Sequence, residues 1–281
     1  MTAEIQTRRV TFDYPTDGMP KHFVSGDPAM SHVVAMLSAM FPPGEDFFVR
    51  SVRAYRNEIT DAELREQVKG FIGQEAMHGR GHREFNDRLA AMGYPTKGLE
   101  KVVDRSLRIR ERIQGRRANL AVTAALEHYT ATFAETLLSS EEAQRLFDVP
   151  AVRSLLLWHA LEESEHKAVA FDVYRHVGGG ERLRRLMMRM TTVSFVSALV
   201  IATTVSILKD REARRHPARV GRSLAQLRNS PFLDREALRR IRDYNRPGFH
   251  PHDHDASDLL ERWRSALFGP DGSLTPVLKS A

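Results

Sequence analysis

Apolar side chains recur every three or four residues along most of the chain, a spacing that places them on one face of a helix. Residues 27–41 begin with an Asp–Pro pair, which is typical of a helix start. A second helix is predicted to restart near Gly44, with Phe48, Val52 and Tyr55 on one face. Further long helices are predicted over 64–93, 118–140 and 151–177. No long stretch alternates apolar and polar residues, so the pattern predicts an all-α fold.

The chain divides by pattern into three parts. Residues 1–26 lack periodicity and predict an extended N-terminal arm, and 27–180 predict a helical bundle. Residues 181–281 predict an apolar helix and a basic tail, packed on or beside the bundle. The charged stretch 94–117 predicts a long link that could hold a helix of its own.

The segment 190–208 contains no charged residue and has basic residues on both flanks. Its length approaches the ~20 residues that cross a bilayer. Its threonines and serines weaken that interpretation, so a helix buried in the bundle or in a dimer interface is favoured and membrane contact is the alternative.

The composition limits which metal ligands, nucleophiles and partners the chain can have. The chain has 281 residues and no cysteine, which excludes disulfides, thiolate metal sites and cysteine nucleophiles. The net charge of +6 comes mostly from arginine, and no nucleic-acid-binding motif accompanies it, so nucleic acid is not a predicted partner. The first residues lack the apolar core of a secretory signal, and we therefore expect a cytoplasmic protein.

Two Glu-x-x-His pairs lie on two different predicted helices. Glu75 and His78 form the first pair, and Glu163 and His166 form the second. Residues three apart project from one side of a helix. Helical bundles that bind two metal ions use two such helices together with one glutamate from each of two others.

Glu45 and Glu127 are the candidates for the two remaining glutamates. The midpoint between Glu45 and Glu75 falls at residue 60, inside a predicted turn, and the midpoint between Glu127 and Glu163 falls at 145, inside a predicted loop. In an antiparallel hairpin, residues equally far from the turn lie at the same depth. Six ligands could therefore meet in one layer and hold two divalent ions, with iron favoured and manganese or zinc as alternatives.

Several assignments stay open at this stage. Glu162 and Glu165 compete with Glu163, Asp46 competes with Glu45, and Glu135 lies two turns beyond Glu127. Two further histidines are expected to orient the ligands from behind without binding metal: His82, one turn after His78, and His159, one turn before Glu163.

A histidine-rich stretch, "FHPHDHD" at 249–255, also has metal-binding residue types. It departs from the His-x-His-x-Asp-His pattern of β-lactamase-type dimetal hydrolases, because its last two residues are inverted, and that fold requires strands. A surface loop is favoured.

Four blocks carry a resemblance to a known family: "FPPGEDFFVRSVRAY", "GFIGQEAMHGRGHREFN", "ALEHYTA" and "WHALEESEHKAVAFDVY". They resemble a bacterial family of predicted metal-dependent hydrolases, over roughly 25–255, which is itself similar to ferritin-like dimetal carboxylate proteins. The resemblance implies a ferritin-like four-helix bundle with additional N-terminal and C-terminal helices. It also implies the same metal positions: Glu45, Glu75, His78, Glu127, Glu163 and His166.

The favoured function is an oxygen-dependent di-iron oxidoreductase acting on an organic substrate, which the apolar segment 190–208 suggests is apolar. The alternative is a hydrolase that uses a metal-bound hydroxide, and a second alternative is a non-catalytic iron-binding bundle. The partners that this interpretation allows are a small-molecule substrate, an electron donor, a second copy of the chain and a membrane surface.

Overall fold

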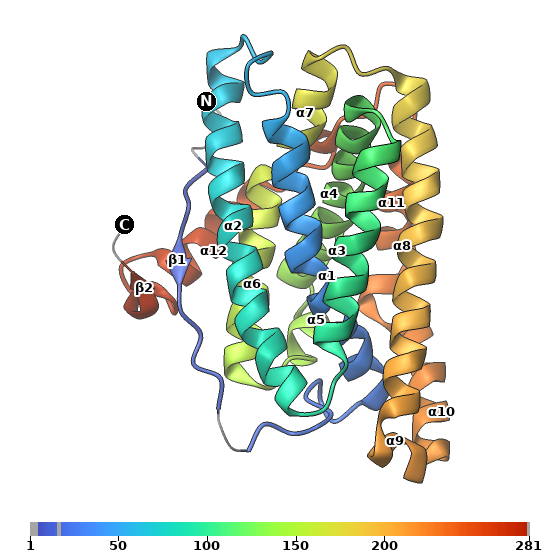
Figure 1. Cartoon of the computed structure of the whole chain (residues 1–281). Coiled ribbons are helices and arrows are strands. Elements are labelled where there is room, and N and C mark those ends of the chain that lie inside the picture. The colour runs from blue at the N-terminus through green and yellow to red at the C-terminus, as the bar shows by residue number, and fades with distance from the viewer. Residues whose placement is uncertain (1–4, 16–17, 280–281) are drawn as a thin grey trace.

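The computed structural model describes residues 5–15 and 18–279, and these are helical nearly throughout (Figure 1). Within them the only strands are β1 (Arg9–Val10) and β2 (Leu278–Lys279), which pair antiparallel. The all-α prediction is confirmed.

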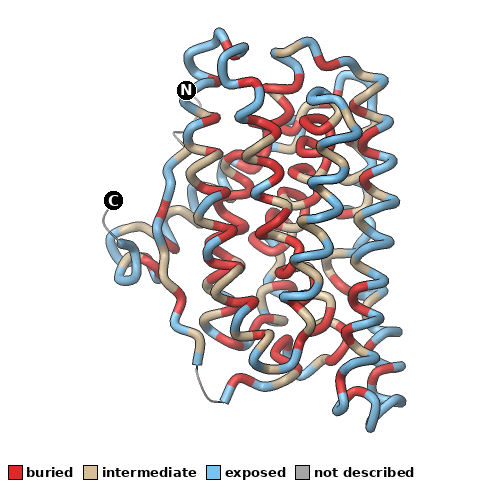
Figure 2. The backbone as a smooth tube through the Cα atoms, in the orientation of Figure 1, coloured by how far each residue is buried: buried red, intermediate tan, exposed pale blue. Residues whose placement is uncertain are grey.

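Four long segments form the centre of the molecule, and we call them the four central segments. They are α1 (Pro28–Arg53), α2 (Ala62–Ala91), α4 (Arg116–Ser139) and the consecutive pair α6 (Pro150–His166) and α7 (Val169–His176). The helix α1 packs on α2 and α4, and α6 and α7 pack on α4 and α2, so the segments enclose one interior. Figure 2 shows the buried residues concentrated there.

The apolar interior consists of two clusters. One contains Met36, Phe85 and Leu155, and the other contains Phe71 and Leu120. Along each central segment, the glutamate predicted to bind metal lies between residues of the two clusters. A polar layer is therefore held between two apolar ones.

The prediction of a separate N-terminal helix with a restart near Gly44 is wrong, because α1 continues through Pro42 and Pro43. A proline inside a helix lacks the N–H that would bond the carbonyl four residues earlier. For Pro42 that carbonyl belongs to Ser38, and the side chain of Asn86 on α2 donates to it at 3.0 Å. A side chain from the neighbouring helix thus replaces the missing backbone bond.

The single helix predicted over 151–177 is instead two helices, because a turn at Lys167 and Ala168 separates α6 from α7. The interruption comes directly after His166. Lys167 is buried there and its ammonium group donates to the carboxylate of Glu135, at 2.8 Å, and to the carbonyl of His254, at 2.6 Å.

The predicted link between the second and third central segments contains α3 (Thr96–Ile113), which packs on α1. The loop predicted before α6 contains the short helix α5 (Glu141–Arg145).

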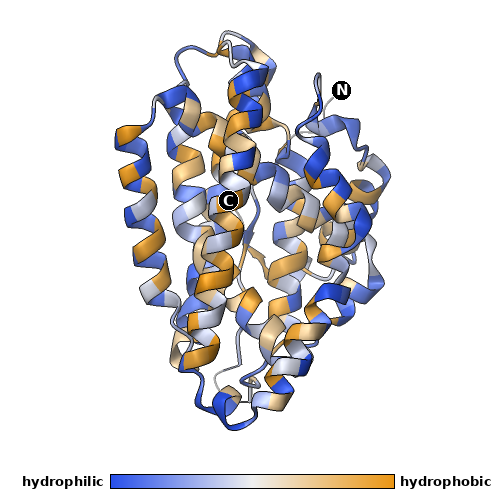
Figure 3. Ribbon diagram, turned by 90° about the vertical axis from the view of Figure 1, so that its right-hand side faces the viewer, coloured by the Kyte–Doolittle hydropathy of each residue, from blue (hydrophilic) through white to orange (hydrophobic). Residues whose placement is uncertain are grey.

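The apolar helix predicted after the glycines is α8 (Glu181–Lys209), which lies along α1 and α4. It is the one helix in the described part of the chain that is long and apolar enough to cross a membrane, judged by length and composition. Only 22% of its most apolar window is buried, so the prediction of a buried helix holds for one side alone. Figure 3, which looks at the molecule from the side of α8, shows hydrophobic residues along this surface.

The C-terminal tail wraps around the central segments, with α10 on α1, α11 on α4 and α12 on α6. Its elements are α9 (Arg211–Arg215), α10 (Pro217–Gln226), η1 (Leu227–Asn229), η2 (Pro231–Leu233), α11 (Arg235–Asp243), η3 (Pro251–Asp253), α12 (Ser257–Phe268) and η4 (Thr275–Val277).

The predicted N-terminal arm lies along α2 and contains β1; of residues 1–26, 1–4 and 16–17 lie outside the described residues. Two glycines on α2 leave room for it. A Cβ atom at Gly70 would overlap the backbone of Ile5, and one at Gly73 would overlap the side chain of Thr7.

Candidate metal centre

The six residues predicted from spacing converge in the polar layer. Their ligand atoms form overlapping groups in which all atoms lie within 4.8 Å of one another, and every member is buried. One end of the layer holds Glu45 and His78, and the other holds Glu127 and His166. Glu75 and Glu163 lie between them.

His159, predicted to orient its neighbour from behind, also lies in this layer with a nitrogen close enough to serve as a ligand. Its Nε2 atom lies 2.9 Å from Oε1 of Glu163 and 3.7 Å from Oε1 of Glu45. The sequence contained the signal, because His159, Glu163 and His166 are spaced four and three apart and so share one side of α6. The layer therefore contains four carboxylates and three imidazoles.

His78 and His166 each turn one ring nitrogen away from the layer, to an acceptor. Nε2 of His78 lies 3.0 Å from Oε2 of Glu162, and Nδ1 of His166 lies 2.8 Å from Oε1 of Gln74. A neutral histidine that donates from one nitrogen has a lone pair on the other. Those lone pairs face carboxylate oxygens at 3.2–3.9 Å, an arrangement suited to a shared cation.

A chain of hydrogen bonds determines the orientation of the His159 ring in the same way. The hydroxyl of Ser38 donates to Asn86, so Nδ1 of His82 donates to that hydroxyl. Nε2 of His82 must then accept from Nδ1 of His159, 2.7 Å away. Nε2 of His159 points into the layer and forms a hydrogen bond with Oε1 of Glu163, 2.9 Å away. His82 contacts the layer only through His159, and its role behind the ligands stays a prediction.

The atoms that face into the layer lack hydrogen-bond partners. Buried polar atoms are nearly always hydrogen-bonded, since leaving one unpaired costs about 1–3 kcal/mol. A cluster of nine unpaired atoms is therefore exceptional in a folded chain. They are both carboxylate oxygens of Glu45, Glu75 and Glu127, Oε2 of Glu163, Nδ1 of His78 and Nε2 of His166. All are potential metal-ligand atoms, so the residues present fit a divalent metal.

The pKa values of three of the four carboxyl groups show how unfavourable their charges are without a cation. The fourth, Glu163, is also buried, but its hydrogen bonds with His159 and His166 lower its pKa well below the usual value. Burial, and then the neighbouring carboxylates, raise the pKa of Glu45 and Glu75 well above the usual value. Burial and Glu163 raise the pKa of Glu127 to about 7. Burial alone would lower the pKa of His166, but the carboxylates around it, Glu127 first, raise it well above the usual value. Positive charge is favoured at this place.

Arg8, on the N-terminal arm, supports the layer from outside, and no pattern in the sequence pointed to it. Its guanidinium group lies 3.1 Å from Glu162, which is buried, and 2.8 Å from Glu165, whose side chain is only 1% exposed. Glu162 accepts from His78, and Glu165 accepts from the amide of Gln74. Of the three competing glutamates, Glu163 alone therefore belongs to a candidate metal-binding group.

The other acidic competitors bind elsewhere. Asp46 is exposed and pairs with Arg83 at 2.6 Å. Glu135 is buried, but it pairs with Lys167 and Arg240. Both carboxylates are compensated within the chain.

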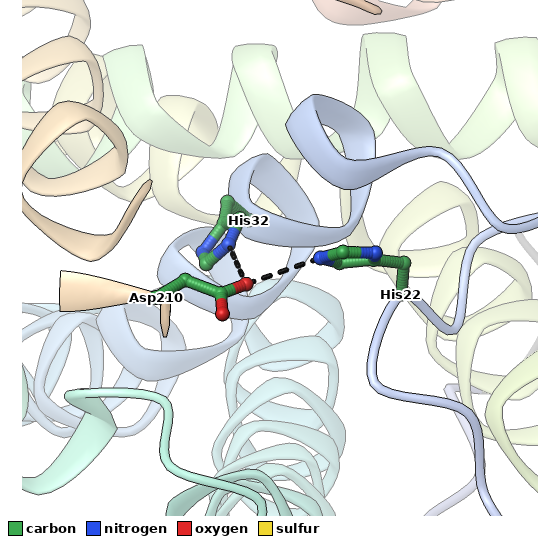
Figure 4. Close-up of side chains that lie close together, drawn as sticks. All are labelled: His22, His32 and Asp210. Carbon is green, nitrogen blue, oxygen red and sulfur yellow. Dashed lines mark hydrogen bonds and ion pairs between the residues drawn. The ribbon is translucent and has the colours of Figure 1, made fainter. Parts of the chain in front are cut away.

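A second buried cluster, of His22, His32 and Asp210, also has metal-ligand geometry (Figure 4). Both imidazoles lie at hydrogen-bond distance, 3.1 and 3.2 Å, from one oxygen of Asp210, and its other oxygen accepts from the backbone of Glu212. His32 also bonds Ser206 at 2.7 Å. Because these bonds satisfy the cluster internally, it is explained as a hydrogen-bond network.

The stretch 249–255 forms no metal cluster within the described residues. His250 pairs with Asp172 at 2.8 Å, and His254 lies 3.4 Å from Asp243. The prediction of a loop is consistent with this arrangement.

An apolar cavity of about 860 Å³ leads to the layer from the side of α8. His159 and Glu163 belong to its lining, so one end of the cavity opens on the candidate ligands.

Comparison with known proteins gives one match. A family described as predicted metal-dependent hydrolase matches residues 6–255, which is most of the chain. Neither a curated protein nor a solved structure matches.

Proposed function

The chain belongs to the predicted metal-dependent hydrolase family, and from this membership we propose that its polar layer holds two divalent metal ions and hydrolyses a small organic substrate. The observation that supports the proposal most strongly is the set of nine unpaired ligand atoms gathered in one buried layer, because buried polar atoms nearly always have a partner. The sequence alone favours oxidation and leaves hydrolysis as the alternative. The family description supports hydrolysis better.

The ligands divide between two ions. Glu45, His78 and His159 would hold one, and Glu75, Glu127 and His166 the other, with Glu163 between them. Bound divalent ions act as Lewis acids that lower the pKa of water and polarise a carbonyl group. Two Glu-x-x-His helices and two single-glutamate helices are the arrangement of dimetal carboxylate bundles, and on this ground we assign the four central segments to the ferritin-like type.

The protein contributes orientation and exclusion of water. The outward hydrogen bonds from His78, His166 and His159 aim their inward nitrogens at the layer, where a metal ion would take the place of any proton that they carry. The apolar residues around the layer exclude bulk water, so electrostatic interactions within it are strong. The layer meets the cavity at His159 and Glu163, and a substrate carbonyl would enter there.

The second candidate is the oxygen-dependent di-iron oxidoreductase. The ligand set favours it, because four carboxylates and three imidazoles without a thiolate suit iron. Both candidates require the same ligands, so the choice of metal and the need for oxygen separate them.

The test uses purified chain stripped of metal and reloaded with zinc, manganese or ferrous iron, assayed without oxygen on p-nitrophenyl esters. We expect ester cleavage that needs metal but not oxygen, that Glu45→Gln abolishes and that the neighbouring Asp46→Asn retains. Cleavage that occurs without metal, or turnover seen only with iron and matched by oxygen uptake, would overturn the hydrolase.

A further inference from the structure

The cavity that reaches the polar layer has almost no polar groups to offer a ligand. Its lining is made chiefly by aliphatic and aromatic side chains from α1, α4, α8, α10 and α11. The hydroxyls in it are mostly bonded within the chain: Tyr129 donates to Thr192, which donates to a backbone carbonyl, and so do Thr130 and Thr204. Only Thr203 has an unpaired hydroxyl. Arg242, which is exposed, is the one charged residue of the lining besides Glu163. A ligand of this cavity has to be apolar along most of its length.

The two ends of the cavity differ. The inner end carries the polar groups of His159 and Glu163, beside the ring of Phe41, which lies 4.7 Å from that of His159. Toward solvent the lining includes exposed apolar residues such as Val196, on α8, and Leu224, on α10. This polarity pattern matches a molecule with one reactive polar group and a hydrocarbon chain.

We propose that the substrate is a long-chain ester whose hydrocarbon chain fills this cavity and whose acyl carbonyl meets the polar layer at His159 and Glu163. The substrate class rests on the proposed hydrolase function, whereas binding of the chain rests on the cavity alone. In the reaction, the oxygen of water bonds to the acyl carbon and the acyl C–O bond breaks. One proton of the water goes to the departing alcohol oxygen, and the other is released as the acid ionises.

Chain binding is tested in metal-free protein, with alkanols from butanol to dodecanol displacing an anilinonaphthalene dye. Each added methylene should tighten Kd about fourfold until the cavity is full. Val196→Asp, in the lining, should weaken dodecanol binding by at least about tenfold, because it places a charge against the chain. The matched control Val193→Asp, exposed on the same helix but outside the lining, should change it by less than about twofold. Equal affinity for all lengths, or equal loss in both variants, would overturn the proposal.

A second experiment tests the long-chain substrate class independently of the hydrolase function. Metal-loaded protein is assayed on p-nitrophenyl esters from acetate to dodecanoate, and kcat/KM should rise with chain length and fall in Val196→Asp. Cleavage of acetate and dodecanoate at the same rate would refute the long-chain substrate but leave the hydrolase. Length-dependent binding without cleavage of any ester would refute the hydrolase but leave the chain-binding cavity.

The outer face of α8 carries a second, independent inference. Apolar residues spaced three, four or eight apart form an exposed stripe that adjoins the mouth of the cavity without contributing to its lining. They are Leu186, Met190, Val193, Ile201 and Val205, each at least 42% exposed. The stripe extends over about 29 Å at ~1.5 Å per residue.

The charges around this stripe indicate what covers it. Arg182, Arg185 and Arg189 lie near its start and Lys209 at its end, and no acidic residue occurs between Glu181 and Asp210. Pairing two copies of α8 in either direction would bring basic ends together. An apolar stripe between basic ends suits a helix lying in the surface of an anionic bilayer. We infer that α8 binds such a surface.

Flotation with vesicles tests this inference. The protein should bind vesicles of phosphatidylcholine with phosphatidylglycerol at least about tenfold better than phosphatidylcholine alone, with loss of binding at high salt. Val193→Asp with Ile201→Asp should remove binding, whereas Ile113→Asp, an exposed apolar residue on α3, should not. Equal loss in the α3 variant, no binding to either vesicle, or a dimer in light scattering that the α8 variant dissociates would overturn it.

Discussion

Replacing Glu127 by glutamine should stabilise the protein without metal and weaken its response to metal. Glu127 is fully buried, both its oxygens lack partners, and burial with Glu163 raises its pKa to about 7. A carboxyl group whose pKa is raised on folding lowers the protein's stability as the pH rises from the usual 4.5 to the folded value of about 7, and the full loss is present above it. The shift from the usual 4.5 to about 7 corresponds to about 3 kcal/mol at pH 8, at about 1.4 kcal/mol per pKa unit.

Glutamine carries no charge, so the variant regains part of the free energy of unfolding that the ionised Glu127 removes. Its amide leaves unpaired polar atoms of its own, which cost about 1–2 kcal/mol. We therefore expect the metal-free variant to gain about 1–2 kcal/mol in the free energy of unfolding at pH 8. With metal the sign reverses, because the variant has lost a ligand and the stabilisation that metal adds should shrink.

The assay is chemical unfolding at pH 8, with and without metal, and the chain contains a matched control. Glu135 is equally buried and lies on the same helix, but its charge is paired with Lys167 and Arg240. Glu135→Gln should destabilise both states by about 3 kcal/mol, because it leaves a buried cation unpaired. If Glu127→Gln destabilises the metal-free protein as Glu135→Gln does, the reasoning about uncompensated carboxylates is refuted.

Three further predictions follow from the same structure. His82→Phe should lower metal affinity about 10- to 100-fold in a chelator competition, since it breaks the hydrogen-bond chain to His159; an unchanged affinity would remove His159 from the ligands. Arg8→Leu should cost about 3 kcal/mol in chemical unfolding, because it removes the arginine beside the buried Glu162, whereas Glu165 keeps its ion pair with Arg264. A loss below about 1 kcal/mol would show that the arm is dispensable. Burial first lowers the pKa of His32 to about 4, so stability should fall by up to about 3 kcal/mol as the pH drops from 6.5 to 4. His32→Gln should flatten that part of the pH profile, and an unchanged slope would contradict the assignment.

The sequence predicted the helical segments and the convergence of six residues because both depend on short, regular spacings. The periodicity of apolar residues marks a helix face, and Glu-x-x-His marks one side of a helix. Equal distances from two turns then brought Glu45 level with Glu75 and Glu127 level with Glu163. These relations hold within a helix or within a hairpin.

What the sequence did not predict depends on contacts between distant segments. The helix α1 continues past Pro42 because Asn86, on another helix, donates to the free carbonyl. Arg8 supports the polar layer only because the N-terminal arm runs along α2. The spacing of His159 from Glu163 could have identified it as a ligand candidate. Its role, however, depends on which of its ring nitrogens bonds to His82. No local pattern carries that information.

The central claim is that the polar layer binds metal. Metal analysis of the purified chain, combined with a crystal structure using anomalous scattering, tests it most directly. The account predicts two ions per chain, held by Glu45, Glu75, His78, Glu127, His159, Glu163 and His166. Protein that binds no metal when it is supplied, or anomalous peaks only at His22, His32 and Asp210, would contradict it.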